Sequence, residues 1–185
     1  YVTHEIGHPC HAFDYDKLMA TGGKIIITEA KKGETFTTLD GESFETVGGE
    51  VVFKNGEGTI IDLPSIKGTA NTSVDENTTS VLLLLESIRP DKVRFASMTH
   101  AIRTTAAQLM EKGLDPHLAE ETLAFGIKLY QDICAAQLGS KVFDAFEKQP
   151  QQTPVEITDQ DITRYLGIEL KTETDTHILE QLGCE

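Results

Sequence analysis

Positive charge is scarce in this 185-residue chain. It contains 16 lysines and arginines against 30 aspartates and glutamates, which gives a formal net charge of −14. A surface of this sign repels the phosphate backbone of nucleic acids. We therefore expect any contact with nucleic acid to be local, or to be supplied mainly by another chain.

Cysteine is also scarce. The chain has only Cys10, Cys134 and Cys184, which are far apart in the sequence and include no CxxC pair. An odd number of widely separated cysteines does not form a disulfide framework and is typical of a reducing compartment. We expect a cytoplasmic location.

The sequence lacks a long apolar run, a signal peptide and an initiator methionine. Its longest apolar run is residues 81–85, whereas a membrane-spanning helix needs ~18 residues, so we expect no membrane span. The chain opens at Tyr1 in what reads as the middle of a sequence, and we expect a fragment of a larger protein. Its length suffices for one domain with a real core and a small appendage.

The first half of the chain favours β-structure. β-branched and apolar runs predict strands at residues 24–28, 34–38, 51–53 and 59–62. Asp40-Gly41 predicts a hairpin with a type I′ turn, which needs positive φ at both central residues. Residues 64–77 read as irregular, and the unbroken apolar run 81–85 predicts a strand covered on both faces.

The second half favours helices. We expect them at residues 91–99 and 104–112, and from Asp115-Pro116 to Gly139 with an apolar face that includes Leu123, Ile127 and Tyr130. Residues 142–146 are expected to return to the sheet. The predicted fold class is α+β, with mixed or antiparallel sheets flanked by helices.

A short tail follows this domain. Residues 148–154 are rich in Gln and Pro and are predicted to be a linker between a domain at residues 1–147 and a segment at 155–185. Thr158 and Asp161 have capping-box spacing at the start of the first of two short helices. Two such helices bury too little surface to stand alone, so we interpret 155–185 as the truncated start of a further domain.

A histidine-rich segment near the N-terminus allows two interpretations. In the first, His4, His8, Cys10 and His11 hold a metal. Pro9 would break a helix that presents the first two, the last two are adjacent, and no second ligand pair follows at zinc-site spacing, so we expect no metal site. In the second, the segment presents His11 at a pocket.

Several motifs occur together and in order. On these motifs the chain resembles the central editing domain of the β subunit of bacterial phenylalanyl-tRNA synthetases, over roughly residues 1–147; the tail resembles the start of the next domain of that subunit. The motifs are Glu5-Ile6-Gly7-His8-Pro9-Cys10-His11-Ala12-Phe13-Asp14, Gly33-Glu34-Thr35, Leu39-Asp40-Gly41, Val74-Asp75-Glu76-Asn77-Thr78, Ile102-Arg103-Thr104 with Ala106-Ala107, and Glu111-Lys112-Gly113-Leu114-Asp115-Pro116.

The resemblance implies a function. Domains of this family hydrolyse tyrosine that has been wrongly attached to phenylalanine tRNA, because a phenylalanine pocket discriminates weakly against a ring that merely adds a hydroxyl. The implied partners are that tRNA and a synthetase α subunit, in an assembly of two α and two β subunits. ATP and Mg²⁺ would serve aminoacylation in the whole enzyme, and no cofactor is expected within this fragment.

The resemblance also implies site residues. His11 falls on the family's pocket histidine and would orient water or contact the terminal ribose, and Thr104 would donate a hydrogen bond to the substrate. Gly68 would let the backbone approach the bound amino acid, and Ala106 would leave room for its ring. The open alternatives are a structural histidine, a helix-capping threonine and a turn glycine. Thr105 stands where the family usually has an acid.

The acid that reads the tyrosine hydroxyl is the main departure from the family pattern. Counting back from Pro90 without gaps places Leu84 at the family's glutamate position, whereas Glu86 lies two residues further on. In a strand this shift amounts to ~6.6 Å. A two-residue deletion before Pro90 would bring Glu86 into register. The rival prediction is a module with the same fold and a degenerate pocket, which serves subunit packing.

Overall fold

The computed structural model describes residues 1–146 and 153–184. The chain divides into two compact units, Tyr1–Ala145 and Phe146–Glu185. The linker predicted at 148–154 lies largely outside the described residues, and the assignment of the two predicted domains stays a prediction. Among the described residues, no helix is long and apolar enough to cross a membrane.

The larger unit is built on an antiparallel four-stranded sheet. Its strands β2 (Ile26–Glu29), β5 (Val51–Lys54), β6 (Ile60–Leu63) and β7 (Lys67–Gly68) lie in that order. The hairpin of β3 (Thr35–Thr37) and β4 (Ser43–Glu45) pairs beside it, and a bridge from Thr38 to Thr69 joins the two. The predicted strands are therefore present, within two residues at either end.

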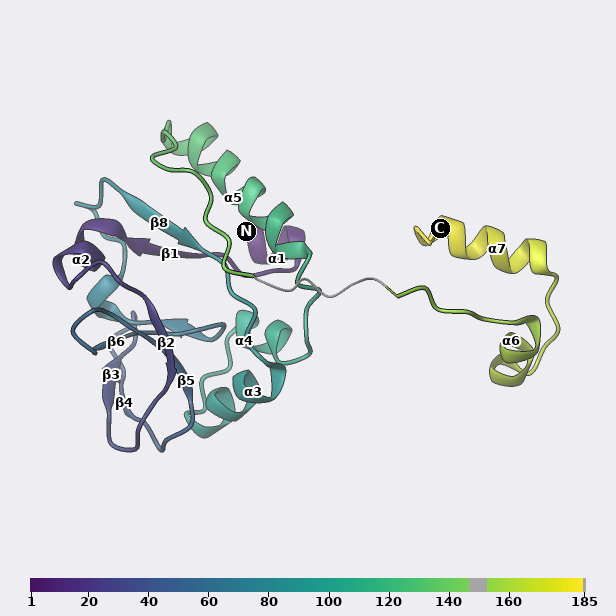
Figure 1. The fold of residues 1–185 in the computed structure, drawn as a ribbon, viewed down its shortest axis with the longest axis horizontal. Helices are drawn as coiled ribbons and strands as arrows, with labels where there is room; N and C mark the ends of the chain where they lie inside the picture. Colours follow the sequence, from purple (N-terminus) through teal and green to yellow (C-terminus); the bar gives the residue numbers. More distant parts are fainter. Residues whose placement is uncertain (147–152, 185) are drawn as a thin grey trace. The chain divides into compact units, whose positions relative to one another are not determined.

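A separate two-stranded ribbon brings the N-terminal segment to the middle of the chain. It pairs β1 (His11–Asp14) with β8 (Val81–Leu84), with His11 opposite Leu84 and Phe13 opposite Leu82. Figure 1 shows this ribbon between α5 (Leu118–Cys134) and the four-stranded sheet. Both faces of the predicted strand 81–85 are thus covered, although its side chains keep partial exposure.

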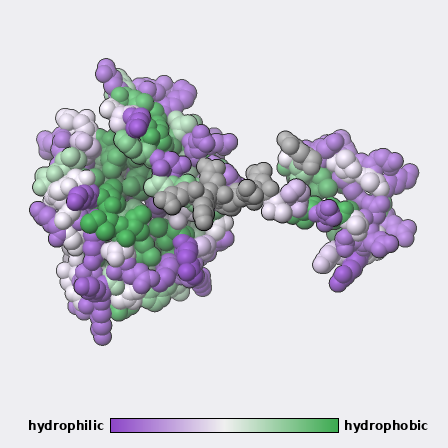
Figure 2. All heavy atoms as spheres, viewed as in Figure 1, coloured by the Kyte–Doolittle hydropathy of each residue, from purple (hydrophilic) through white to green (hydrophobic). Residues whose placement is uncertain are grey.

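Two apolar clusters hold these layers together. One joins the sheet to α3 (Pro90–Thr99) and α4 (Thr105–Met110), and the other joins the ribbon to the sheet through Phe13, Phe53 and Ile61. On the face that Figure 2 shows, hydrophobic residues of the larger unit gather in the middle and hydrophilic residues lie along the rim. The second cluster is the one that positions the candidate site, because it fixes the distance between ribbon and sheet.

The remaining elements cap the larger unit. Short helices α1 (Val2–Ile6) and α2 (Tyr15–Ala20) flank β1, and a 3-10 turn, Ala70–Thr72, follows β7. The side chain of Asp14 accepts a hydrogen bond from the backbone of Lys17 and begins α2. These caps set the direction in which the chain enters and leaves the ribbon.

The hairpin turn differs from the predicted type. The N–H of Gly41 donates to the carbonyl of Thr38 at 2.8 Å, so Leu39 and Asp40 are the central residues. Only Gly41 has positive φ, at 88°, and Asp40 does not. The loop therefore has three residues, of which only the last, Gly41, is left-handed, and such loops are the next most common hairpin connection after type I′ and II′ turns. The predicted type I′ turn was wrong, although the hairpin is present.

Two predictions for the end of this unit were also wrong. Helix α5 ends at Cys134 with Ala135 in the left-handed conformation, four residues before Gly139. Its last turn is poorly buried, since Ile133 is 76% exposed, and helices in proteins depend on such burial for their stability. Residues 142–146 form no strand either, and Phe143 is 78% exposed.

The second unit contains two short helices, as predicted. They are α6 (Asp159–Leu166) and α7 (Thr172–Gln181). The capping box is formed, with the Thr158 hydroxyl accepting from the Asp161 backbone and the Asp161 carboxylate accepting from the Thr158 backbone. Reciprocal bonds of this kind satisfy donors that a helix start leaves free.

Candidate functional site

His11 lies at the start of β1 and points toward the sheet. Its ring packs on Phe13, with ring centroids 4.4 Å apart, and reaches Gly68 on β7. Burial lowers the pKa of His11 below its ordinary value. The imidazole is therefore neutral at pH 7, with one ring nitrogen free to accept a hydrogen bond.

His11 leaves no room for a side chain at position 68. A Cβ atom added at Gly68 would lie 2.5 Å from Cε1 and 3.1 Å from Nε2 of His11. Real Cβ atoms do not approach that closely, so any other residue would push the ring away. The structure thus brings two of the predicted site residues together. The approach of Gly68 to a substrate stays a prediction.

Glu86 follows β8 and turns inward. Its Oε1 accepts hydrogen bonds from the backbone N–H of Ser65, at 2.7 Å, and from the Ser65 hydroxyl, at 3.1 Å. Burial raises the pKa of Glu86 to about 7, although both of these bonds act in the opposite direction. Ser65 has φ of 65°, so the carboxyl also secures an unusual backbone turn between β6 and β7.

Leu84 occupies a different position. Its apolar side chain packs against the apolar cluster of Phe13, Phe53 and Ile61. The carboxyl next to the β6–β7 turn is that of Glu86, which is hydrogen-bonded to Ser65. Ser65 lies three residues before Gly68 in the chain. Whether Glu86 reads a substrate hydroxyl stays a prediction.

A third titratable group in this region was not predicted. Asp62 on β6 is 2% exposed and pairs in register with Gly68. Burial raises its pKa well above the ordinary value, and the nearby Glu86 raises it further. An aspartate inside the apolar run Ile60–Leu63 is the sequence signal that would have found it, because such a run is buried and a carboxyl there needs a reason.

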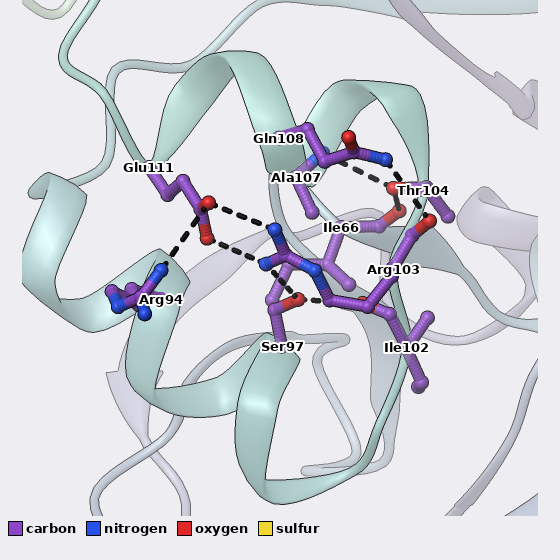
Figure 3. A network of polar contacts seen from close by, with 9 residues as sticks. All are labelled: Ile66, Arg94, Ser97, Ile102, Arg103, Thr104, Ala107, Gln108 and Glu111. Carbon is purple, nitrogen blue, oxygen red and sulfur yellow. Dashed lines mark hydrogen bonds and ion pairs between the residues drawn. The ribbon is translucent and has the colours of Figure 1, made fainter.

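Thr104 caps α4 and holds the same turn from the other side. Its hydroxyl accepts from the backbone N–H of Ala107, at 3.1 Å, and donates to the carbonyl of Ile66, at 2.7 Å. Figure 3 shows these bonds beside the ion pair of Arg103 with Glu111. The capping alternative is therefore realised in the structure. The catalytic role of Thr104, and a ring contact by half-buried Ala106, stay predictions.

The corner between α3 and α4 fixes the position of Thr104. Arg103 donates two hydrogen bonds to the carboxylate of Glu111, at 2.6 and 2.8 Å, and a third to the hydroxyl of buried Ser97. Ser97 in turn donates to the carbonyl of Ile102 at 2.6 Å. This ion pair holds the pKa of Glu111 below its ordinary value and raises that of Arg103. The loop before Thr104 is thereby held rigidly (Figure 3).

The other members of the histidine-rich segment do not converge. His4 lies exposed on α1, whereas His8 is 1% exposed and its Nδ1 donates to the carbonyl of Pro9 at 2.6 Å. Burial and the nearby Glu86 raise the pKa of Cys10 to about 11, so its thiol keeps its proton. Residues 1–146 and 153–184 contain no group of three or more His, Cys, Asp or Glu side chains arranged for a metal.

Comparison with known proteins accounts for the architecture. Residues 1–135 match the B3/4 domain family. The chain belongs to the B3/4 domain family. It is 34% identical over 182 residues to the phenylalanine–tRNA ligase beta subunit of Clostridium acetobutylicum, covering 98% of this chain and 23% of that subunit. Against the beta subunit of Pectobacterium atrosepticum it is 30% identical over 185 residues, covering 100% and 23%.

The B3/4 match confirms the resemblance stated from the motifs, and the α+β class is confirmed by the fold. A third relative, the beta subunit of Halalkalibacterium halodurans, is 31% identical over 183 residues, covering 99% of this chain and 22% of that subunit. The chain thus spans less than a quarter of the length of these relatives.

Two open surface pockets of the larger unit do not include His11, Gly68 or Glu86 in their lining. One, of about 380 Å³, is lined by Thr104, Lys67 and His100 among others. The other, of about 680 Å³, lies along the β3–β4 hairpin and includes Phe36. The B3/4 domain thus presents Thr104 at a surface hollow, while His11, Gly68 and Glu86 lie in the layer between ribbon and sheet.

Proposed function

We infer that this chain is the editing part of a phenylalanyl-tRNA synthetase β subunit and hydrolyses tyrosine esters of phenylalanine tRNA. The observation that carries this is the grouping of His11, Gly68 and Glu86 between the β1–β8 ribbon and the β6–β7 turn. The Glu86 carboxyl is buried in this layer and is not directed to solvent, as recognition of a hydroxyl by hydrogen bonding requires. Relatives named as beta subunits of this ligase support the assignment.

The chemistry asked of the protein is modest. Ester hydrolysis needs a water molecule held against the carbonyl, and a neutral imidazole accepts a hydrogen bond from such a water. His11 is neutral because burial lowers its pKa. Thr104 would add a hydroxyl near the ester, Ala106 would leave space for the ring, and Gly68 would let the backbone approach.

The charge of the domain assigns tRNA binding largely to its surroundings. With a net charge of −14, the chain contributes little attraction for phosphate. We propose that the tRNA is held mainly by the rest of an assembly of two α and two β subunits in the cytoplasm. ATP and Mg²⁺ serve aminoacylation there, and this domain needs no cofactor for hydrolysis.

The test is deacylation of tyrosyl-tRNA. The 185-residue chain is assayed alone, and also after replacing the matching segment of the Clostridium acetobutylicum β subunit within its assembled synthetase. We expect the replaced enzyme to release tyrosine, and His11→Ala combined with Thr104→Ala to slow release ~100-fold, since a positioned acid–base group contributes about that much.

Two matched variants control for folding. Thr104→Ser keeps the capping hydroxyl, and His4→Ala removes a histidine from the exposed surface of α1. His4→Ala should release tyrosine at the unmodified rate, and Thr104→Ser should release it faster than the double alanine variant does. Normal deacylation by the double alanine variant would show that the site is assigned to the wrong residues.

A second candidate function is a packing module with an inactive pocket. It is favoured by one specific observation, namely that Thr104 and Glu86 each already satisfy protein hydrogen bonds. In that case the replaced synthetase charges phenylalanine tRNA normally but releases no tyrosine from mischarged tRNA. The same pair of assays therefore distinguishes the two functions.

A further inference from the structure

Asp62 faces the layer that contains His11. On antiparallel strands, residues directly opposite each other share a face, and Asp62 lies opposite Phe53 on one side and Gly68 on the other. Phe53 belongs to the cluster that joins sheet to ribbon, and Gly68 touches His11. The Asp62 side chain therefore lies on the face of the sheet that is turned toward the ribbon, the face on which Gly68 meets His11.

The described residues compensate the buried carboxyl of Asp62 only weakly. Asp62 is 2% exposed and lies among Ile60, Ile61 and Leu63. Among the described residues, the backbone N–H of Leu63 is the only donor that lowers its pKa, and no lysine or arginine does so. Burying a carboxyl with so little compensation costs stability. A group that costs stability and points into a candidate site is expected to serve the site.

Glu86 is close enough to act on Asp62. Its charge raises the pKa of Asp62, and its own Oε1 is held at Ser65, at the turn that leads from β6 to Gly68. The two carboxyls thus approach from different elements, the end of β8 and the middle of β6. Two carboxyls within mutual reach in a buried place do not both ionise, so one keeps its proton.

We propose that Asp62 and Glu86 act as one pair that recognises the phenolic hydroxyl of a tyrosyl group. Protonated Asp62 donates a hydrogen bond to the phenol oxygen, and Glu86 accepts one from the phenol O–H. The nature of the ligand rests on the proposed editing function. The new element is Asp62, which makes recognition the work of two carboxyls instead of one glutamate.

The pair explains selectivity better than one acid alone. A phenol hydroxyl is both donor and acceptor, so a protonated and an ionised carboxyl together satisfy it completely. A phenylalanine ring in the same place offers neither carboxyl the hydrogen bond that the phenol hydroxyl would make, which is the kind of loss that rejects an analogue most strongly. No proton leaves the pair in this recognition.

The test measures binding, which does not require hydrolysis. The 185-residue chain is titrated with tyrosinamide and with phenylalaninamide, and binding is followed by NMR. We expect the unmodified chain to prefer tyrosinamide at least ~10-fold, as the loss of a buried polar partner predicts. Asp62→Leu should abolish the preference, and Asp62→Asn, whose amide still donates, should keep most of it.

Stability separates recognition from a structural role. Because Asp62→Leu removes a poorly compensated buried carboxyl, it should unfold at the same or a higher denaturant concentration than the unmodified chain. Asp175→Asn is the matched control, since it changes another buried aspartate, on α7 in the second unit. It should leave the tyrosinamide preference unchanged.

The outcomes for the pair and for the function are distinct. An unchanged preference in Asp62→Leu, or no preference in the unmodified chain, overturns the pair. A preference that depends on Asp62, without release of tyrosine from mischarged tRNA, upholds the pair and overturns the hydrolytic function. Release of tyrosine with a preference that ignores Asp62 upholds the function and overturns the pair.

Discussion

The α3–α4 corner and the layer around His11 treat charge in opposite ways. At the corner, Arg103 meets Glu111 through two short hydrogen bonds, and the pKa of the carboxyl is lowered. In the layer, Asp62 and Glu86 lie together, and burial raises the pKa of both. The corner uses charge to hold a loop in place. The layer buries two carboxyls, and no lysine or arginine among the described residues lowers the pKa of either one. Buried acids with raised pKa values are typical of functional sites.

The largest expected effect that separates the two regions is a pH dependence due to Glu86. Its pKa is about 7 in the folded chain against an ordinary 4.5. Between these values the folded state keeps a proton that the unfolded state releases, so this group's contribution to stability is full below pH 4.5 and lost as pH rises through 7. From pH 5 to 8 we expect Glu86 to lower the free energy of unfolding by on the order of 2–3 kcal/mol.

The measurement is urea unfolding of the unmodified chain and of Glu86→Gln at several pH values. The amide of glutamine still accepts from Ser65 and does not titrate, so the difference between the two chains should narrow or reverse toward high pH. Glu76→Gln changes an exposed carboxylate and serves as the control. Parallel pH curves for the unmodified chain and Glu86→Gln would mean that Glu86 ionises as freely as a surface acid.

The second effect concerns packing. Close contact with Gly68 positions His11, whereas the ion pair of Arg103 with Glu111 positions Thr104. Gly68→Ala places a Cβ against the imidazole of His11. We expect a loss of ~1–3 kcal/mol in the free energy of unfolding, the usual cost of overpacking. Gly139→Ala is the control, because an added Cβ there meets nothing within 4 Å.

A double-mutant cycle makes this prediction specific. In the combined variant His11→Ala, Gly68→Ala, the ring that the new Cβ would meet is gone, so Gly68→Ala should cost little in that background. Equal costs of Gly68→Ala with and without the histidine would show that Gly68 is required by the backbone of β7 and not by His11.

The elements of the corner were more predictable from sequence than those of the layer. The signals for a helix start lie in the local sequence, since Pro90 is the first residue of α3 and Thr104 is the N-cap of α4. The hairpin near Gly41 is announced equally locally. Strand β1 carries no such pattern, because its residues follow a segment of Gly, Pro and His that reads as a turn, and it forms only by pairing with β8 some 70 positions away.

The choice between Leu84 and Glu86 shows the same limit for the site. Both residues follow the same apolar run, and sequence spacing alone favours neither. The pairing of His11 with Leu84 sends Leu84 into the apolar cluster and leaves Glu86 beyond the ribbon, free to reach Ser65. Asp62 could have been found by its place in a buried run, but its neighbours could not, because they come from β7 and from the end of β8.

The smallest expected effect tests the corner itself. Ser97→Ala removes a buried hydroxyl that donates to the carbonyl of Ile102 and accepts from Arg103. Since the carbonyl loses its partner, we expect a loss of ~1–2 kcal/mol in the free energy of unfolding. Ser140→Ala, at an exposed position, should cost nothing measurable. Because Arg103 keeps its two bonds to Glu111, the pH curve of this variant should stay parallel to that of the unmodified chain between pH 5 and 8. A change in that curve would mean that the corner and the carboxyl pair are coupled through the Ile66 turn that Thr104 holds, and the two regions would then act as one.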